Sequence, residues 1–139
     1  MKILVDVNVI IDAIENREPF AAAAQQILLY VELKYSESYV TADSLTNLYY
    51  VIHHLTHSKK RARDVITSTL ELFHVLDISE SDCRLAHLAS RPDFEDSILI
   101  ETAHRHHIDY IITRNVKDFA HSPVPAITPE AFLTKLQKS

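Results

Sequence analysis

The sequence predicts an α/β fold: a single three-layer α/β/α domain with helices on both faces of a mostly parallel sheet of about five strands. Two observations support this fold class. Short runs of β-branched and aromatic residues alternate with longer segments in which apolar residues recur every three or four positions. The chain has 139 residues, the size of one ordinary domain, so we expect one domain over residues 1–139.

The strand-like runs and the helical stripes can be placed in order. Strands are predicted at 3–5, 39–41, 74–76, 110–113 and 124–127. Helices are predicted over 20–31, 45–55 and 62–73, with shorter ones around 82–90 and 95–106. A closing helix is expected from Thr128, because threonine can cap a helix and Pro129 suits its first turn. This alternation of strands and helices favours parallel strand pairing.

Composition narrows the classes of function. The net charge is −5, so we do not expect nucleic acid to bind through overall positive charge, and contacts with phosphates must be local. Glycine is absent, which argues against the phosphate-cradling loops of nucleotide-binding proteins. The one cysteine, Cys83, cannot form an internal disulfide, and no stretch approaches the roughly 20 apolar residues of a membrane-spanning helix. We therefore expect a soluble, cytoplasmic protein.

Carboxylate and amide side chains follow the predicted strands. In open parallel sheets, ligands bind beyond the carboxyl ends of the strands. The side chains found there belong to Asp6, Asn8, Asp43, Asn47, Asn115 and Asp118, and Asp93, Glu95 and Asp96 stand at the start of a predicted helix. Carboxylates gathered at one edge repel one another unless a cation lies among them, and oxygen ligands select hard ions such as Mg²⁺ or Mn²⁺. The pattern predicts a divalent-metal site, which suits phosphodiester hydrolysis.

Several of these residues also have a purely structural interpretation. Asp6 ends an otherwise apolar strand, where an unpaired buried charge is costly, and this favours a functional role. Asn8 either serves the site or caps the following helix. Asp93 and Asp96 either bind a metal or form a capping box, since they lie three residues apart at a predicted helix start. Asp118 is either a metal ligand or an exposed turn residue.

Three segments, taken in order, resemble the successive motifs of PIN domain proteins. They are Leu4-Val5-Asp6-Val7-Asn8, Asp93-Phe94-Glu95-Asp96 and Ile112-Thr113-Arg114-Asn115-Val116-Lys117-Asp118-Phe119. The order and spacing match over nearly the whole chain. The resemblance implies a metal-dependent ribonuclease fold, common among toxins of the VapC-like kind, which pair with a small antitoxin and often form homodimers.

The resemblance also assigns roles to individual positions. Asp6 matches the first metal-binding acid of the family and Asp96 matches the acid that opens the later helix. Thr113 matches the hydroxyl residue after the fourth strand, and Asn8 matches the polar residue that usually follows the first acid. The resemblance therefore implies that Asp6 and Asp96 bind the metal, with Thr113 and Asn8 beside them.

The sequence departs from the family pattern at two positions. The second acid of the family falls at Asn47, and the acid after Thr113 falls at Asn115, so each is an amide in this chain. An amide oxygen can bind a hard cation but contributes no charge, which lowers metal affinity. Asp93, Asp43 or Asp118 could compensate for the missing charge, and Asp118 is the favoured candidate. The predicted metal-binding set is Asp6, Asp93, Asp96 and Asp118.

The predicted function is that of a Mg²⁺- or Mn²⁺-dependent endoribonuclease that cleaves RNA, as the toxin of a toxin–antitoxin pair. The alternative is a degenerate, non-catalytic PIN domain that binds RNA or a protein. A phosphotransfer domain is a weaker hypothesis, because the residues after Asp6 supply no convincing partner for a phosphorylated acid. Arg114 and Lys117 either hold the RNA backbone or lie on the surface without such a role.

Overall fold

The central feature of the molecule is a five-stranded sheet in the order β3-β2-β1-β4-β5, in which every neighbouring pair is parallel. The structure is a computed structural model that describes residues 1–138. The strands are β1 (Lys2–Val5), β2 (Glu37–Thr41), β3 (His74–Leu76), β4 (Tyr110–Ile112) and β5 (Ala126–Ile127). The predicted fold class is confirmed, and each strand overlaps a segment that the sequence predicted.

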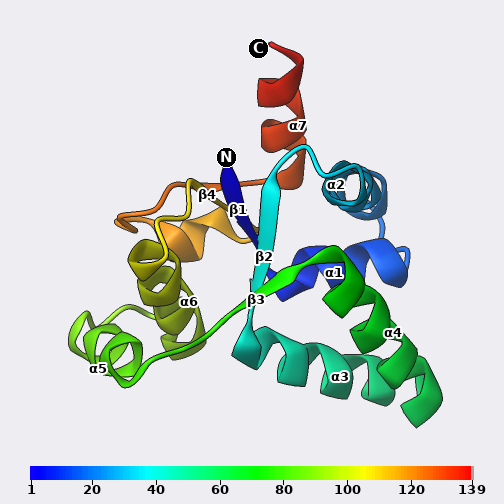
Figure 1. Ribbon diagram of the computed structural model, residues 1–139, viewed down its shortest axis with the longest axis horizontal. Helices are drawn as coiled ribbons and strands as arrows, with labels where there is room; N and C mark the ends of the chain where they lie inside the picture. Colours follow the sequence, from blue (N-terminus) through cyan, green and yellow to red (C-terminus); the bar gives the residue numbers. More distant parts are fainter. Residues whose placement is uncertain (139) are drawn as a thin grey trace.

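Helices cover both faces of the sheet (Figure 1). They are α1 (Val7–Ile14), α2 (Ala21–Glu32), α3 (Ala42–Thr56), α4 (Lys59–Leu72), α5 (Glu80–Leu88), α6 (Phe94–Arg105) and α7 (Pro129–Gln137), with a 3₁₀ turn η1 (Val116–Phe119). Residues of α1, α2, α3, α4 and α7 belong to one hydrophobic core, and α6 belongs to a second core with η1 on the opposite face. The result is the three-layer arrangement expected from the sequence.

Strand β1 lies at the centre of the sheet and separates the two cores. Ile3 and Val5 face the larger core, whereas Leu4 between them faces the smaller one, and all three are fully buried. Because both faces of a parallel strand are covered, its sequence is continuously apolar instead of alternating. This explains why, within residues 2–6, the two ionisable side chains, those of Lys2 and Asp6, stand at the two ends of the segment.

Two short elements were not specified in advance. Helix α1 begins at Val7, directly after β1, with Asp6 as its N-cap residue. The interpretation of Asn8 as the cap is therefore wrong, because Asn8 already lies inside the helix. The 3₁₀ turn η1 holds Asp118, which is exposed, so Asp118 lies in a turn as one of its two interpretations expected. None of the helices within residues 1–138 has both the length and the apolar character needed to cross a membrane.

Candidate active site

The site begins where β1 and β4 end side by side. In the parallel register Val5 pairs with Ile112, so the next residues, Asp6 and Thr113, are neighbours across the two strands. The backbone N–H of Asp6 donates to the carbonyl oxygen of Ile112 at 2.9 Å, which extends the pairing by one step. After β1 the chain continues to β2 on one side of β1, and after β4 it continues to β5 on the other side of β4. The strand order therefore reverses between β1 and β4, and open parallel sheets bind ligands at such a switch point.

Asp6 is a buried carboxylate with polar neighbours on one oxygen. Its Oδ2 accepts hydrogen bonds from Thr113 Oγ1 at 2.8 Å and from Asn8 Nδ2 at 3.3 Å. Burial raises the pKa of Asp6, the hydrogen bond from Thr113 lowers it in part, and the negative charge of Glu95 raises it further. Thr113 is itself fully buried, so its hydroxyl group is fixed toward Asp6. Asp6 is therefore held in place while its charge remains poorly compensated.

The first turn of α6 brings a second group of acids to the same edge. Asp93 is the N-cap residue, and its Oδ1 accepts from the backbone N–H of Asp96 at 2.9 Å. Burial raises the pKa of Asp96 to about 7, and the negative charges of Asp6, Asp93, Asp118 and Glu95 add to this effect. The charge of Asp6 thus acts on Asp96 although the two residues are far apart in sequence.

We call Asp6, Asp93, Glu95, Asp96 and Asp118 the acidic cluster. Among residues 1–138, none of its five carboxylates forms an ion pair with Lys, Arg or His, although the chain has such pairs elsewhere. Some acids outside the cluster have basic partners and others, such as Asp43 and Glu71, have none within the described chain, so the cluster is distinguished by the joint effect of its charges on the pKa of Asp96. Five carboxylates without a countercharge form a region that attracts cations.

Two amides that replace family acids lie near the cluster in different ways. Asn47, one helical turn into α3, donates from Nδ2 to Glu95 Oε1 at 3.0 Å. Asn115 is the N-cap residue of η1, and its backbone N–H donates to Thr113 Oγ1 at 3.2 Å. Asp43 instead accepts from the Thr41 hydroxyl group at 2.6 Å.

Glu95 is a member of the acidic cluster to which the sequence assigned no individual role. It was grouped with Asp93 and Asp96 among the acids at the start of a predicted helix, but only Asp93 and Asp96 entered the predicted ligand set. The signal for Glu95 was its place in the same segment as those two acids.

Arg114 does not serve as a free contact for an RNA backbone. Its Nε lies 2.9 Å from Asp12 Oδ2, its terminal nitrogen donates to Asp12 Oδ1 at 3.3 Å, and its guanidinium group stacks 4.4 Å from the ring centre of Phe20. Asp12 is buried on α1 and had no predicted role. Arg114 therefore links the segment after β4 to the helices on one face of the sheet.

With this geometry established, comparison with known proteins identifies the family. A model of the PIN domain family matches residues 2–117. This chain belongs to the PIN domain family. None of the curated proteins compared matches the sequence significantly.

Solved structures share the fold of this PIN domain. A toxin–antitoxin complex from Klebsiella pneumoniae is 26% identical over 91% of this chain and 96% of that chain, with a TM-score of 0.67. A DNA-bound VapBC from Salmonella typhimurium is 18% identical over 93% and 98% of the two chains, with a TM-score of 0.70. The Mycobacterium tuberculosis toxin VapC20, described as cleaving the sarcin-ricin loop, is 11% identical over 85% and 93%, with a TM-score of 0.70.

The acidic cluster of this PIN domain fits a hard divalent cation by its donor chemistry, since all its side-chain donors are carboxylate oxygens. Within residues 1–138, no three Asp, Glu, His or Cys side chains are close enough to form a closed ligand set. Asp93, Glu95 and Asp118 are exposed, whereas Asp6 is buried and held by the hydrogen bond from Thr113.

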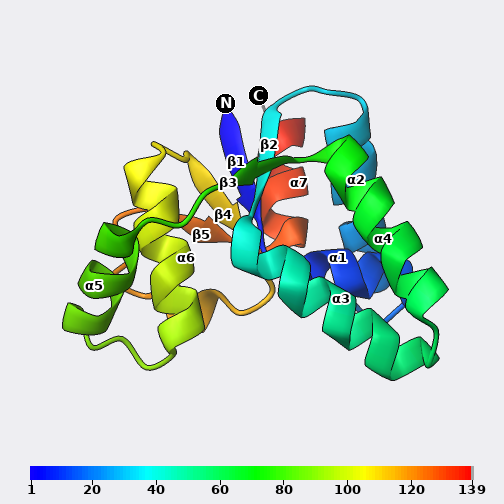
Figure 2. The ribbon, with the colours of Figure 1, turned by 60° about the horizontal axis from the view of Figure 1, so that its bottom comes forward.

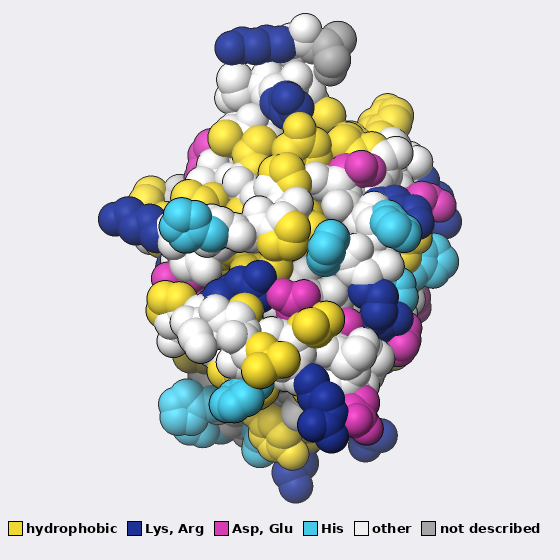
Figure 3. All heavy atoms as spheres, turned by 90° about the vertical axis from the view of Figure 1, so that its left-hand side faces the viewer, with side chains coloured by type: hydrophobic (Ala, Val, Ile, Leu, Met, Phe, Trp, Pro, Cys, Tyr) yellow, Lys and Arg dark blue, Asp and Glu magenta, His cyan; other side chains and the backbone are white. Residues whose placement is uncertain are grey.

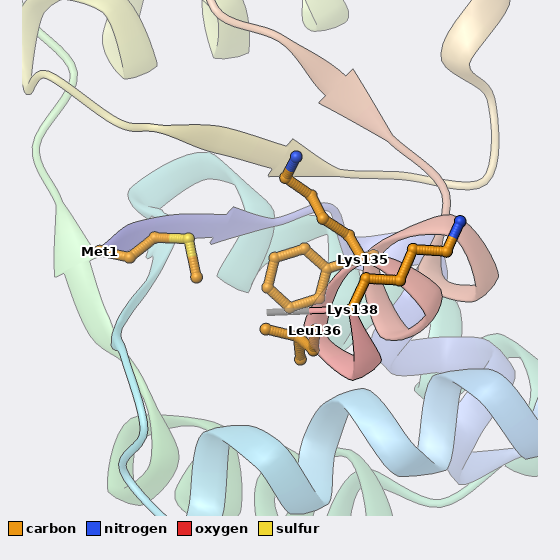
Figure 4. A pocket seen from close by; sticks show the side chains of 5 residues that line it. Met1, Lys135, Leu136 and Lys138 are labelled. Atoms are coloured by element: carbon orange, nitrogen blue, oxygen red, sulfur yellow. The ribbon is translucent and has the colours of Figure 1, made fainter.

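Other surface features of this PIN domain lie away from the cluster. A cavity of about 450 Å³ lies between Met1 and the end of α7, at the amino ends of the strands, and is lined by Phe132, Lys135, Leu136 and Lys138 (Figure 4). It contains no acid and lies at the edge opposite Asp6. On the face over α5 and α6, charged and hydrophobic side chains are interspersed, without a continuous basic area on that face (Figure 3).

Proposed function

We propose that this PIN domain is a Mg²⁺- or Mn²⁺-dependent endoribonuclease. The observation that carries the proposal is the acidic cluster, in which carboxylates from three separate segments meet without a basic partner and Asp96 has a pKa raised to about 7. Such a cluster costs stability unless something compensates its charge, and functional sites are where such costs are retained. Membership of the PIN domain family supports the metal-dependent nuclease chemistry that such an acidic cluster suits.

The proposed roles follow the sequence prediction. Asp6, Asp93, Asp96 and Asp118 would hold the ion, with Asp6 fixed by the hydrogen bond from Thr113. A bound divalent ion supplies activation of water and stabilisation of the leaving oxygen in phosphodiester hydrolysis. The protein's part is to orient the carboxylates, through the buried Thr113 hydroxyl group and the capping hydrogen bond from the Asp96 N–H to Asp93.

The test compares wild type with Asp6→Asn and Asp96→Asn for cleavage of a mixed RNA pool in Mn²⁺ and in EDTA. Wild type should cleave only with Mn²⁺, and each variant should lose at least about 100-fold in rate. Asp64→Asn is the matched control, because Asp64 is an exposed acid that pairs with Lys60 on α4. Equal cleavage by all four proteins would remove the catalytic assignment.

A non-catalytic role remains the alternative because of two amides. Asn47 and Asn115 stand where the family pattern has acids, and neither adds charge to the cluster. A degenerate domain would bind RNA or a protein without cleaving it. Unchanged RNA length in Mn²⁺, together with retained binding of the same pool in EDTA, would favour this second function.

We also propose that the protein is a toxin that pairs with an antitoxin. Support comes from the solved relatives, among them the Klebsiella pneumoniae toxin–antitoxin complex at 26% identity. A search for a short reading frame at the upstream end of the gene, followed by co-expression with its product, tests the idea: growth arrest by the chain alone and its relief by the second protein are expected. Light scattering of the purified chain tests the proposed homodimer.

A further inference from the structure

The hairpin formed by α3 and α4 carries a basic surface on an acidic protein. Residues 44–63 contain no Asp or Glu, whereas the whole chain has a net charge of −5. Four exposed cations lie on the early turns of α4, namely Lys59, Lys60, Arg61 and Arg63. Lys60 pairs with Asp64 at 2.9 Å, and within residues 1–138 the other three have no acidic partner. The uncompensated positive charge attracts anions to this part of the molecule.

A groove between α3 and α4 adjoins these cations. The two helices pack against each other on the side of the sheet away from α5 (Figure 2). Two open hollows of about 320 and 310 Å³ lie along their contact and share Tyr49 and Ile66. The first extends along α3 between Leu45 and Tyr50, and Arg63 lines the second. We call these joined hollows the α3–α4 groove, which places aromatic side chains next to a cation.

Tyr50 provides a large exposed ring at the edge of the groove. The residue is 64% exposed. Its ring meets that of Tyr49 at an angle of 86°, with 5.3 Å between the ring centroids. Tyr49 in turn lies 6.1 Å from the ring of His53, again between centroids. An exposed aromatic ring that is steadied by a neighbouring ring is a surface on which a nucleic-acid base can stack.

The groove begins close to the acidic cluster. Asn47 on α3 donates to Oε1 of Glu95 on α6 at 3.0 Å, so this turn of α3 lies against the cluster. Tyr50 follows Asn47 by three residues, which makes their side chains neighbours on one face of the helix. Three residues of helix rise only about 4.5 Å. A strand bound in the groove would therefore pass next to the carboxylates.

We infer that the α3–α4 groove binds single-stranded RNA, with a base stacked on Tyr50 and phosphates held by Lys59 and Arg63. The inference rests on RNA as the substrate of the proposed function and adds the surface that holds this substrate. The acidic cluster and the net negative charge repel RNA, so its phosphates need cations close to the site. Lys59 and Arg63 are four residues apart and share one face of α4. Single strands suit the groove because their bases are free to stack on aromatic side chains.

The first test removes the phosphate contacts and measures RNA binding without cleavage. Fluorescence anisotropy in EDTA follows a labelled RNA of mixed sequence and about 12 nucleotides. Lys59→Gln combined with Arg63→Gln should weaken binding at least about tenfold and reduce the slope of log affinity against log salt by about 1.4, because each phosphate contact on a single strand contributes about 0.7. A purely structural effect would leave that slope unchanged. Lys135→Gln combined with Lys138→Gln is the matched control, because both are exposed lysines at the end of α7, and it should bind as wild type does.

The second test concerns the stacked base. Tyr50→Ala should weaken binding of the single strand at least about fivefold without changing the salt slope. Tyr50→Phe keeps the ring and should bind as wild type does. Tyr35→Ala is the matched control: Tyr35 is 69% exposed and has one tyrosine neighbour, Tyr30, at 5.7 Å between ring centroids, but it precedes β2 at the other end of the sheet. Thermal melts establish that each variant folds.

Three results would overturn the inference. The first is an unchanged affinity and salt slope for the Lys59→Gln, Arg63→Gln protein, or no binding by wild type at about 50 mM salt. The second is duplex RNA bound as tightly as the single strand, since paired bases are not free to stack on Tyr50. The third is loss of the dimer in Tyr50→Ala with RNA affinity unchanged, which would assign the groove to a second copy of the chain.

Cleavage assays in Mn²⁺ separate this inference from the proposed nuclease function. If wild type binds RNA through the groove but does not cleave it, the nuclease assignment fails and the groove stands. If wild type cleaves RNA with a KM that Lys59→Gln and Arg63→Gln together leave unchanged, the groove is overturned and the nuclease assignment stands. The expected result is cleavage by both proteins, with a KM at least about tenfold higher in the variant.

Discussion

Replacing Asp96 by asparagine should stabilise the metal-free protein at neutral pH. Its pKa rises from 3.8 to about 7 on folding, which at 1.36 kcal/mol per pKa unit is an upper limit of about 4 kcal/mol. The side chain is only partly buried, so solvent screening reduces this to about 1–2 kcal/mol. Losing a negative charge from the first turn of α6 costs about 0.3–1 kcal/mol through the helix dipole. The relief of repulsion exceeds the loss of the helix-dipole interaction, so the free energy of unfolding should rise by about 1 kcal/mol, which corresponds to roughly 3 to 5 °C in Tm.

The pH dependence of the stability difference between Asp96→Asn and wild type is the most specific part of this prediction. Because the folded-state pKa of Asp96 lies above the unfolded value, the folded state holds more protons between these two values, and its contribution to stability falls as pH rises from about 4 to about 7. The gain from Asp96→Asn should therefore grow over this range and level off above it.

Thermal melts in EDTA between pH 4 and 8 measure the difference between wild type and Asp96→Asn. The exposed Asp64 on α4 again provides the control, and Asp64→Asn should change the free energy of unfolding by less than about 0.5 kcal/mol at every pH. A difference between Asp96→Asn and wild type that is independent of pH, or a loss of stability at pH 8, would refute the claim that Asp96 lies in an uncompensated acidic cluster.

Three further predictions concern the site and its support. Thr113→Val removes the 2.8 Å donor to buried Asp6 and should lower the free energy of unfolding at pH 7 by about 1–3 kcal/mol in urea titrations, with Thr113→Ser close to wild type. Burial disfavours the charge of Asp82, but hydrogen bonds led by that from Arg105 outweigh it and lower its pKa. Arg105→Gln should therefore lower Tm by roughly 5 °C at pH 7, and by progressively less as the pH falls from about 4 through the lowered pKa of Asp82. Protons and Mn²⁺ compete for Asp96, so calorimetric Mn²⁺ affinity should rise up to about tenfold per pH unit below 7 and flatten above it, and an affinity independent of pH would contradict this.

The fold was predictable because its signals are local and mutually consistent. Each strand carries a short apolar run, and the α2, α3 and α4 stripes show helical spacing that the structure reproduces. The edge at which Asp6 and Thr113 meet followed from a general rule on parallel sheets, and the register of β1 and β4 realises it. The expectation that Asp96 acts together with Asp6 came from the resemblance to PIN domains, because periodicity carries no information about contacts between distant residues.

The parts that were not predicted depend on side-chain pairings across the fold. The position of Arg114 after a strand does not show whether its side chain is free to bind RNA or pairs with another residue. In the structure, Arg114 forms an ion pair with the buried Asp12. The contribution of Glu95 is of the same kind, since it depends on how α3 and α6 approach each other. Such pairings are set by helix packing angles, which the sequence pattern does not specify.

The amide at position 47 has a structural context that the sequence pattern alone did not offer. A loss of charge at position 47 would weaken a metal site if nothing else changed, yet a carboxylate from the facing helix lies against that amide. The negative charge of Glu95 on α6 adds to the effects that raise the pKa of Asp6 and of Asp96. What an ion would recognise is the number and location of carboxylates at the sheet edge, and the helix from which each one comes is secondary.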